Sequence, residues 1–501
     1  MLLHKTLEQT AARSPKHCAL VADGVRYSYA EIEALATAMA TRLAALGVRR
    51  GDRVATLLDN RLDAVLAIYA ALKCGAVFMP INPLTKSDKL AYLLNDSEAR
   101  VLITQEALRR EYAPALAGAP GVQACLVVEA DGADHGTGAT GVAPPATPVA
   151  IDIDLASILY TSGSTGEPKG VMLTHLNMLS AARSISQYLG LRGSDVILCA
   201  LPLAFDYGLY QVLMGFLVGA TVVLERSFAF PVKVLERMAS ERVTVFPGVP
   251  TMFSMLMGLK NLGAYDLASL RLITNTAAAL PESHIRDLRS QFPQAQLFSM
   301  YGLTECKRVT YLPPEQLDIR PTSVGRGMPN EEVWLVDESG QRLPYGSTGE
   351  LVIRGSHVMR GYWRKPEATA RRLKPGPLPG EMVLYSGDIF RTDAEGYLYF
   401  VARKDDIIKS RGEKVSPREV ENVLYSMPGV QDAAVIGVDD ELLGQAIKAF
   451  VVLRDGHMAS EREIIKYCAA RLESFMAPKY VTIVPVLPRT ATGKISKSGL
   501  E

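Results

Sequence analysis

Short apolar runs alternate with helix-length segments along the first third of the chain. Val54–Leu58 and Ala76–Pro80 have the pattern of buried strands, and Ala64–Cys74 between them has that of a helix. The alternation continues through further apolar runs at Val101–Thr104 and Cys125–Val128. Strands that alternate with helices predict an α/β fold, in which helices cover a sheet.

The same alternation resumes in the middle of the chain. Strands are predicted at Asp195–Leu203, Ala220–Leu224, Val243–Pro247, Leu270–Asn275 and Gln296–Met300, with a helix around Val232–Arg242. Several of these strands end in loops that carry polar residues. Ligands of open α/β sheets bind outside the carboxyl ends of the strands, so we expect these loops to converge on one site.

Local signals refine this pattern at three places. Ser28 followed by Glu31 three residues later predicts a capping box at the start of a helix. Ile151–Leu159 alternates apolar and polar residues, as a half-buried strand does. Asp131–Pro148 is rich in Gly, Ala, Thr and Pro without periodicity, which predicts a surface loop with no chemistry of its own.

The pattern changes to short strands with Gly turns from about Val333. Three such strands, Val333–Val336, Gly349–Arg354 and Gly396–Ala402, predict a small antiparallel subdomain. A compact α+β unit follows, with predicted elements at Pro417–Ser426, Ala433–Val438, Ile447–Leu453 and Glu461–Leu472. We therefore predict a large N-terminal domain of helix-flanked sheets, residues 1–404, and a small, mobile C-terminal α+β domain, residues 405–501.

Composition narrows the class of protein. A chain of 501 residues is too long for one core, and a net charge of +1 gives no basic field for nucleic acid or acidic lipid. Six scattered cysteines without a CxxC pair favour a reducing, cytoplasmic compartment over a structural zinc site. The N-terminus becomes charged too early for a signal peptide, and Lys73 interrupts the apolar region Ala64–Leu84, which therefore reads as core and not as a membrane span.

The stretch from Tyr160 to Gly170, YTSGSTGEPKG, is the strongest candidate for chemistry. Every residue from Thr161 to Gly166 is Gly, Ser or Thr, so backbone N–H groups and hydroxyls can approach a phosphate closely. Lys169 adds a cation nearby. The spacing is not that of a Walker A loop, and an ordinary Gly/Ser hairpin turn is the alternative interpretation.

Six motifs in a fixed order carry a resemblance that covers essentially the whole chain. They are Tyr160–Gly170, Tyr301–Glu305 (YGLTE), Tyr385–Asp388 (YSGD), Val401–Arg403 with Asp405, Lys409–Val415 with Pro417–Glu421, and Pro488–Lys494 (PRTATGK). In these motifs the chain resembles the acyl- and aminoacyl-adenylate-forming superfamily. Its members include acyl-CoA synthetases, stand-alone adenylation domains of nonribosomal peptide synthetases and firefly-type luciferases.

The resemblance implies an ATP site with bound Mg²⁺. Glu305 matches the Mg²⁺ ligand and Thr304 the contact to the α-phosphate, while Lys494 would reach the α-phosphate and the reacting carboxylate. The nucleotide-binding residues that the resemblance implies are Thr161, Ser162, Gly163, Ser164, Thr165, Gly166 and Lys169 for the phosphates, Thr276, Ala277, Ala278 and Tyr301 for adenine, and Asp388 and Arg403 for ribose. His175 is predicted to be a packing residue and not a base.

A second half-reaction is also implied. The small domain would rotate about Asp405 after the adenylate forms, withdrawing Lys494 and presenting Lys409 to a pantetheine thiol. The thiol belongs either to CoA or to a separate acyl or peptidyl carrier protein. Leu303 in the second motif is more usual in CoA ligases than in peptide synthetase domains, but the acceptor stays open.

The pocket for the small carboxylic acid substrate is predicted from the same resemblance. Its residues are Phe205, Asp206, Tyr207, Tyr210, Pro247, Ile273, Asn275, Met300, Arg308 and Val309. Asp206 matches the aspartate that binds the substrate amine in amino-acid-activating relatives. A buried aspartate needs a partner, and either a substrate ammonium or Arg308 would serve. The pair could also hold both ends of a β-amino acid or an amino dicarboxylic acid.

Several functions therefore remain open at this stage. A polar acid, possibly an amino or β-amino acid, leads over an aryl acid or a medium-chain fatty acid, because Tyr207 and Tyr210 would shorten a long alkyl tunnel. A luciferase-like oxygenase would use the same adenylate. A non-catalytic binding protein is expected to have lost Lys494 or Glu305, and both residues are present.

Overall fold

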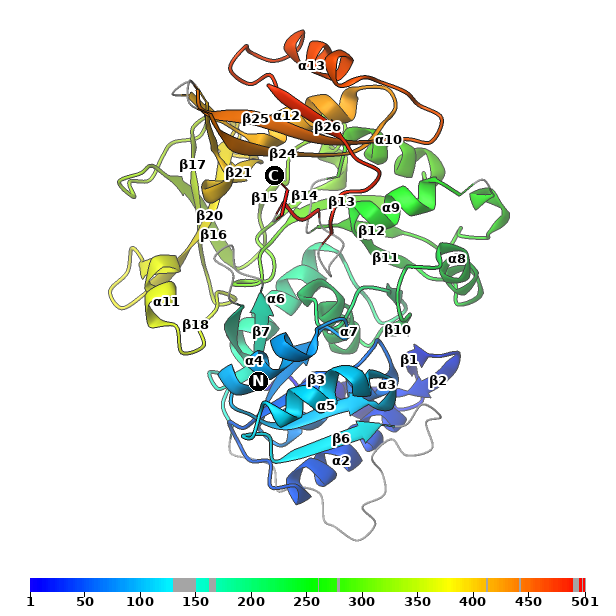
Figure 1. The fold of residues 1–501 in the computed structure, drawn as a ribbon. Coiled ribbons are helices and arrows are strands. Elements are labelled where there is room, and N and C mark those ends of the chain that lie inside the picture. The colour runs from blue at the N-terminus through cyan, green and yellow to red at the C-terminus, as the bar shows by residue number, and fades with distance from the viewer. Residues whose placement is uncertain are drawn as a thin grey trace.

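The computed structural model describes residues 1–128, 150–161, 168–259, 261–276, 280–410, 413–440, 443–489, 495–497 and 499–500, with the backbone alone at 405, 409, 414 and 444. Figure 1 shows two large sheets with helices in the lower and middle parts, an antiparallel sheet at the left and a small domain at the top. This arrangement confirms the predicted α/β fold with an antiparallel subdomain and a small α+β domain.

A nine-stranded sheet forms the middle of the molecule. In spatial order its strands are β15 (Arg326–Gly327), β14 (Thr310–Leu312), β13 (Gln296–Tyr301), β12 (Leu272–Asn275), β11 (Val245–Gly248), β9 (Val196–Cys199), β10 (Thr221–Leu224), β1 (Cys18–Ala22) and β2 (Val25–Ser28). The strands from β13 to β1 are parallel and those at both edges are antiparallel. The loops after β11, β12 and β13 therefore leave the sheet at one edge.

A seven-stranded sheet lies below it. Its strands, in spatial order, are β18 (Gly361–Tyr362), β8 (Lys169–Thr174), β7 (Leu155–Thr161), β4 (Val77–Ile81), β3 (Arg53–Leu57), β5 (Ala99–Gln105) and β6 (Ala124–Val128). β7 and β8 form an antiparallel hairpin, and the short strand β18 adds to its outer edge. The hairpin thus holds both ends of the loop that the sequence singles out.

Helices surround these sheets and fill the space between them. They are α1 (Lys5–Arg13), α2 (Tyr29–Ala45), α3 (Leu62–Lys73), α4 (Ser87–Asp96), α5 (Arg109–Ala117), α6 (His175–Tyr188), α7 (Asp206–Val218), α8 (Pro231–Ser240), α9 (Pro250–Met257), α10 (Glu282–Gln291) and α11 (Pro366–Arg372), with the 3-10 turns η1 (Glu106–Leu108), η2 (Leu262–Ala264) and η3 (Pro314–Gln316). In α3, residues 62–72 are all buried, and a helix that is apolar on every side belongs in a core. Across the described ranges, no helix combines the length and apolar character needed to span a membrane.

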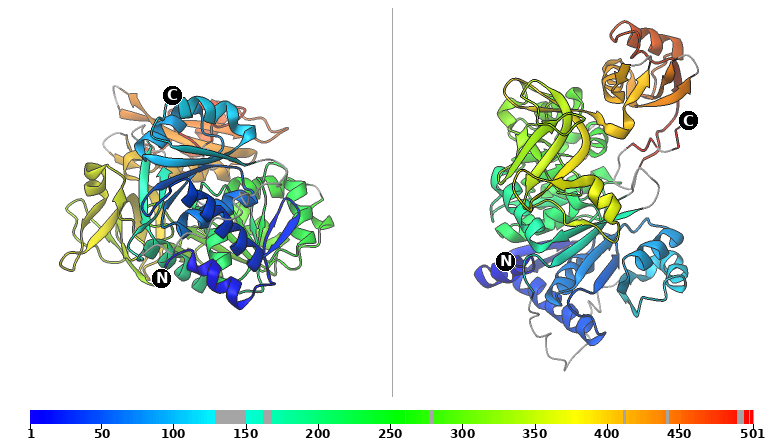
Figure 2. Two further views of the ribbon diagram at one scale, coloured as in Figure 1. Left: turned by 90° about the horizontal axis from the view of Figure 1, so that it is seen from below. Right: turned by 90° about the vertical axis from the view of Figure 1, so that its left-hand side faces the viewer.

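The antiparallel subdomain consists of β16 (Glu331–Val336), β17 (Thr348–Gly355), β20 (Met382–Thr392), β19 (Leu373–Pro375) and β21 (Leu398–Arg403). The turn η4 (Lys404–Asp406) leads from it to the small domain. That domain comprises β22 (Ile408–Ser410), β23 (Glu413–Val415), α12 (Pro417–Ser426), β24 (Val430–Asp440), β25 (Gly444–Leu453), α13 (Glu461–Ala469) and β26 (Tyr480–Ile483). It has an apolar core of its own, and Figure 2 shows it standing apart from the large sheets.

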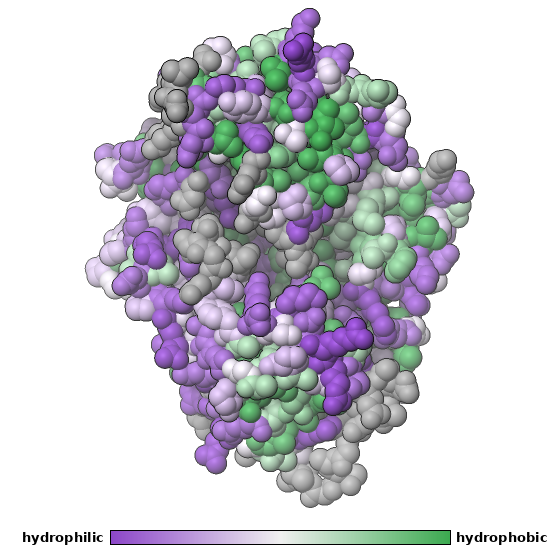
Figure 3. Space-filling view, viewed as in Figure 1, coloured by the Kyte–Doolittle hydropathy of each residue, from purple (hydrophilic) through white to green (hydrophobic). Residues whose placement is uncertain are grey.

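The surface of the small domain is less polar than the rest of the face seen in Figure 3. Hydrophilic side chains cover much of that face, and apolar side chains gather over the strands at the top. The small domain also has a second apolar cluster, which contains Phe450, Val452 and Leu487. Both sides of the small sheet are therefore packed.

Two predicted strands are shorter than expected. β7 begins at Leu155, because the carboxylate of Asp154 accepts a hydrogen bond from Ile151 N at 2.9 Å and closes a turn. β9 ends at Cys199, because Asn60 takes over the hydrogen bonds beyond it: its amide donates to Leu201 O and accepts from Leu203 N. In both places a side chain replaces sheet pairing, which an apolar pattern does not reveal.

Gly325 connects the nine-stranded sheet to the antiparallel subdomain, and its substitution is expected to destabilise the fold. Its φ is +87°, and a Cβ there would lie 1.7 Å from Tyr311 O. We expect Gly325→Ala to lower the free energy of unfolding by about 3 kcal/mol or more. Gly346, at φ +84° with open space around it, is the matched control, and Gly346→Ala is expected to cost about 1 kcal/mol. Equal shifts of the two thermal midpoints would contradict the crowding at Gly325.

Candidate active site

The residues predicted for the acid pocket gather at the carboxyl edge of the nine-stranded sheet. Gly248, Asn275 and Ser299 are paired in register on β11, β12 and β13, so the loops after these strands start side by side. α7 begins at Asp206 on the same edge, with Phe205 as its N-cap residue. The sequence prediction that polar loops meet here is confirmed by the topology.

The loop that is predicted to hold phosphates is closed by the β7–β8 hairpin. Thr161 pairs with Lys169 in register, and its hydroxyl donates to Lys169 O at 3.5 Å. Residues 162–167 lie outside the described residues, so the predicted phosphate contacts of Ser162, Gly163, Ser164, Thr165 and Gly166 stay predictions. The ammonium of Lys169 lies 5.9 Å from the centre of the Tyr362 ring.

Glu305 lies in a turn after β13 and contacts the segment that contains Met359 and Tyr362. The hydroxyl of Tyr362 donates to Glu305 Oε1 at 2.6 Å, and Met359 N donates to Glu305 O at 2.7 Å. Met359 and Tyr362, which are three residues apart, thus hold the backbone and the carboxylate of Glu305. A single hard carboxylate fits Mg²⁺, which protein sites hold through one or two carboxylates together with substrate phosphates and water.

The predicted ribose and adenine residues meet beside Glu305. Asp388 and Arg403 are paired in register on β20 and β21, and Arg403 Nε lies 3.9 Å from Asp388 Oδ1. The hydroxyl of Tyr301 donates to Asp388 Oδ2 at 2.5 Å. Burial raises the pKa of Asp388, against the opposing effects of Tyr301 and Arg403. Of the other adenine residues, Thr276 is buried at the end of β12, and 277–278 lie outside the described residues.

The acid-pocket residues come from α7 and the neighbouring strand ends. Tyr207 and Tyr210 are buried on the first turns of α7, and the Tyr207 hydroxyl lies 2.8 Å from Thr274 O, which ties α7 to β12. Five further predicted residues are buried at the ends of β11, β12 and β13 or in the loop after β13: Pro247, Ile273, Asn275, Met300 and Val309. Phe205 is half-buried and meets Tyr207 edge to face at 6.3 Å.

Lys307 is the site residue that the sequence interpretation missed. Its Nζ lies 3.7 Å from Asp206 Oδ2, and it lies 4.7 Å from the centre of the Tyr210 ring. The residue is only 3% exposed, and burial lowers its pKa to about 7. The cationic partner of Asp206 within the protein is therefore Lys307, whereas the sequence analysis considered a substrate ammonium or Arg308. A lysine next to a motif is usually a solvated surface residue. The burial of Lys307 follows from the inward turn of the backbone, which the sequence does not show.

Arg308 is buried beside this ion pair. Its side chain is 1% exposed, and its guanidinium carbon lies 5.2 Å from the centre of the Tyr207 ring. Its Nε has no hydrogen-bond partner within the described parts of the chain. Arg308 is thus in the predicted pocket but holds no carboxylate there.

The small-domain residues are only partly placed. Lys409 lies on β22, opposite Lys414 of β23, and Asp405 lies in η4 between the two domains. Lys494 lies outside the described residues, so its position cannot be compared with the site. His175 is buried at the first position of α6 and accepts a hydrogen bond from Leu3 N at 3.0 Å, which confirms the packing role predicted for it.

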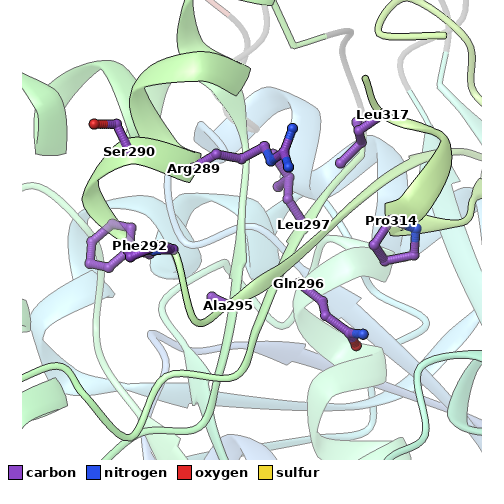
Figure 4. A pocket seen from close by; sticks show the side chains of 9 residues that line it. Arg289, Ser290, Phe292, Ala295, Gln296, Leu297, Pro314 and Leu317 are labelled. Atoms are coloured by element: carbon purple, nitrogen blue, oxygen red, sulfur yellow. The ribbon is translucent and has the colours of Figure 1, made fainter. Parts of the chain in front are cut away.

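A separate pocket of about 410 Å³ lies at the opposite end of β13. Figure 4 shows its lining, which includes Phe292 at the end of α10, Gln296 and Leu297 at the start of β13, and Pro314 in η3. Ligands of such sheets bind at the carboxyl ends of strands, and this pocket is at an amino end. It is therefore distinct from the candidate active site.

Comparisons with known proteins agree with this geometry. Residues 7–363 match the family described as AMP-binding enzyme, and residues 419–494 match the AMP-binding enzyme C-terminal domain. A feruloyl-CoA synthase of Amycolatopsis sp is 36% identical over 494 residues, covering 97% of this chain and 96% of that protein. The phosphinothricin tripeptide synthetase PhsC of Streptomyces viridochromogenes is 33% identical and matches 99% of this chain and 45% of its own length.

A solved structure shows the same fold over the full length. It is ATP-bound MatB from Rhodopseudomonas palustris, which matches with a TM-score of 0.91 and 30% identity, covering 100% of this chain and 98% of that one. The family match spans most of the chain. The chain therefore belongs to the AMP-binding enzyme family and is an AMP-forming acid–thiol ligase.

Proposed function

We propose that this protein activates a polar carboxylic acid with ATP and transfers the acyl group to a pantetheine thiol. The observation that carries the substrate class is the buried trio of Asp206, Lys307 and Arg308, defined here as the charged cluster. A pocket for a plain alkyl acid has no use for three buried charges, because burying each one is costly unless it is paired.

In the first half-reaction the acid attacks the α-phosphorus of ATP, and pyrophosphate leaves. Such a step depends on positioning and on stabilising the charge that develops. Thr161 and Lys169 hold the loop beside the leaving phosphates, Thr304 faces the α-phosphate, and Asp388 orients the ribose. Glu305 would hold Mg²⁺, which supplies charge neutralisation at the phosphates when bound.

In the second half-reaction the thiol attacks the acyl-adenylate and AMP leaves. We propose that the small domain, residues 405–501, rotates about Asp405 and brings Lys409 to the thiol. The position of Asp405 supports this, because η4 is a three-residue link between β21 and β22. The similarity to a feruloyl-CoA synthase favours CoA as the acceptor, and the similarity to a tripeptide synthetase supports a carrier protein as the alternative.

The acid itself is proposed to be short and polar, with amino and β-amino acids among the candidates. Tyr207 and Tyr210 are both buried against the cluster, which leaves little room for a long alkyl chain. Aryl acids or medium-chain acids are the second candidate, since relatives named for feruloyl and long-chain fatty acyl substrates align over nearly the whole chain.

A panel of carboxylic acids tests this function. We expect pyrophosphate release to depend on the acid, and polar acids to exceed plain alkyl acids of equal length about tenfold or more in kcat/KM. Adding CoA, and separately a phosphopantetheinylated carrier protein, then identifies the acceptor by thioester formation. Preference for unsubstituted alkyl acids would contradict the polar substrate class, and no release with any acid would contradict acid activation.

A further inference from the structure

The charges in the charged cluster also indicate which second polar group the substrate carries. Two of its members are cations and one is an anion, and all three are at most 8% exposed. Building on the proposed function, we propose that Lys307 serves as the internal counter-ion of Asp206 and that Arg308 selects an acid with a second carboxylate. Lys307 and Arg308 would then be specificity-determining residues of the adenylation reaction.

The loop after β13 is built to turn these cations inward. Lys307 has a φ of +68°, a left-handed conformation that non-glycine residues adopt only where the surroundings enforce it. Gly302 permits the turn, because a Cβ there would lie 2.3 Å from Lys307 O. Val309 N donates to Tyr301 O at 3.0 Å and closes the loop behind them. Surface lysines need no such arrangement.

Lys307 occupies the place that a substrate ammonium would otherwise take. Its Nζ lies 3.7 Å from Asp206 Oδ2 and is also close to the faces of the Tyr207 and Tyr210 rings, at 5.2 and 4.7 Å. A second cation beside Asp206 would meet the charge of Lys307 in a buried setting, where charge repulsion is poorly screened. The pocket therefore disfavours an acid with an ammonium group at this position.

Of the two cations in the charged cluster, Lys307 pairs with Asp206 and Arg308 has no carboxylate partner among the described residues. It takes part in none of the ion pairs found among the described residues, and its guanidinium faces the Tyr207 ring. Glu331, the other charged group that acts on Tyr188, lies against His357 instead, with 2.9 Å between His357 Nε2 and Glu331 Oε2. Burial raises the pKa of Glu331. A carboxylate from the substrate would pair with the planar guanidinium through two hydrogen bonds.

The experiment compares acids that differ only in the second group. Monocarboxylates, α,ω-dicarboxylates and ω-amino acids of three to six carbons, with benzoate and its carboxyl and amino derivatives, are assayed by pyrophosphate release. We expect the best dicarboxylate to exceed its matched monocarboxylate and amino acid about tenfold or more in kcat/KM.

Substitutions in the charged cluster test which residues cause the preference for a dicarboxylate. Lys307→Met keeps the length of the side chain and frees Asp206, so we expect the dicarboxylate preference to fall and the activity with ω-amino acids to rise, each about tenfold. Lys307→Met with Asp206→Asn removes both members of the ion pair and keeps the net charge of the cluster, and it replaces the single variant if that one does not fold. Arg308→Gln should remove the dicarboxylate preference alone. Lys233→Met, at an exposed position on α8, is the matched control and should leave the profile unchanged.

Three outcomes would overturn the inference, and they separate it from the function proposed above. A preference for ω-amino acids leaves the polar substrate class standing and removes the second carboxylate. A preference for plain alkyl acids contradicts both. An unchanged profile in Lys307→Met and Arg308→Gln shows that the cluster does not face the substrate.

Discussion

Replacing Lys494 with alanine is expected to lower the rate of adenylation about 10²–10³-fold. The resemblance to adenylate-forming enzymes places this lysine against the α-phosphate and the reacting carboxylate, where negative charge develops. Its loss should not affect the thiol step, because the small domain is proposed to withdraw Lys494 before that step. Thioester formation from a supplied acyl-adenylate should therefore stay near the unmodified rate. The two half-reactions are measured separately, by pyrophosphate exchange and by thioester release.

Lys497 offers a matched control for this prediction. It lies three residues further along the chain, and its Nζ is 2.7 Å from Glu421 Oε1 of α12. Lys497→Ala removes a cation from the same segment and should cost at most about 1 kcal/mol of stability. Adenylation should change little. Equal loss of both half-reactions in Lys494→Ala would show that the lysine serves the whole cycle and not adenylation alone.

Glu305→Gln is the second change with a large expected effect. The amide oxygen can still accept the hydrogen bond from Tyr362, so the turn is retained, but the negative charge is lost. We expect adenylation to fall about 10²-fold, and the Mg²⁺ concentration for half-maximal rate to rise, because a neutral amide binds this hard cation weakly. Titrating Mg²⁺ at fixed ATP measures both quantities.

Tyr362→Phe distinguishes the effect of the charge of Glu305 from the effect of the orientation of its carboxylate. It removes the 2.6 Å hydrogen bond to Glu305 Oε1 and keeps the ring beside Lys169. Only a small decrease in rate is expected, with an unchanged Mg²⁺ requirement. If Tyr362→Phe shifted the Mg²⁺ titration as much as Glu305→Gln, orientation of the carboxylate would matter more than its charge.

The sequence predicted elements best where local and global signals agree. The capping box is present, with Ser28 N donating to Glu31 at 2.7 Å, and α12 has the predicted bounds Pro417–Ser426. Both depend on neighbours in sequence. The ends of β7 and β9 were wrong, because contacts of Asp154 and Asn60 end the strand pairing there, and the partners of Asn60 are 141 and 143 residues away.

In the candidate site, too, local motifs were predicted correctly and features set by the backbone conformation were not. Asp388 and Arg403 were found through motifs, and the register of β20 with β21 brings them together. The partner of Asp206 was missed, because the choice between Lys307 and Arg308 depends on one backbone angle after β13. Residue type and spacing indicate that Lys307 and Arg308 lie near the pocket, but they do not indicate which of these two adjacent cations pairs with Asp206.

Tyr362 has a use that follows from its two neighbours. Its ring is beside the ammonium of Lys169 at the base of the phosphate loop, and its hydroxyl is bonded to Glu305. The electron density of one aromatic ring is therefore set by a cation on one side and a carboxylate on the other. A fluorinated tyrosine at position 362 would give a ¹⁹F resonance that reports nucleotide arrival and pyrophosphate departure from within the site.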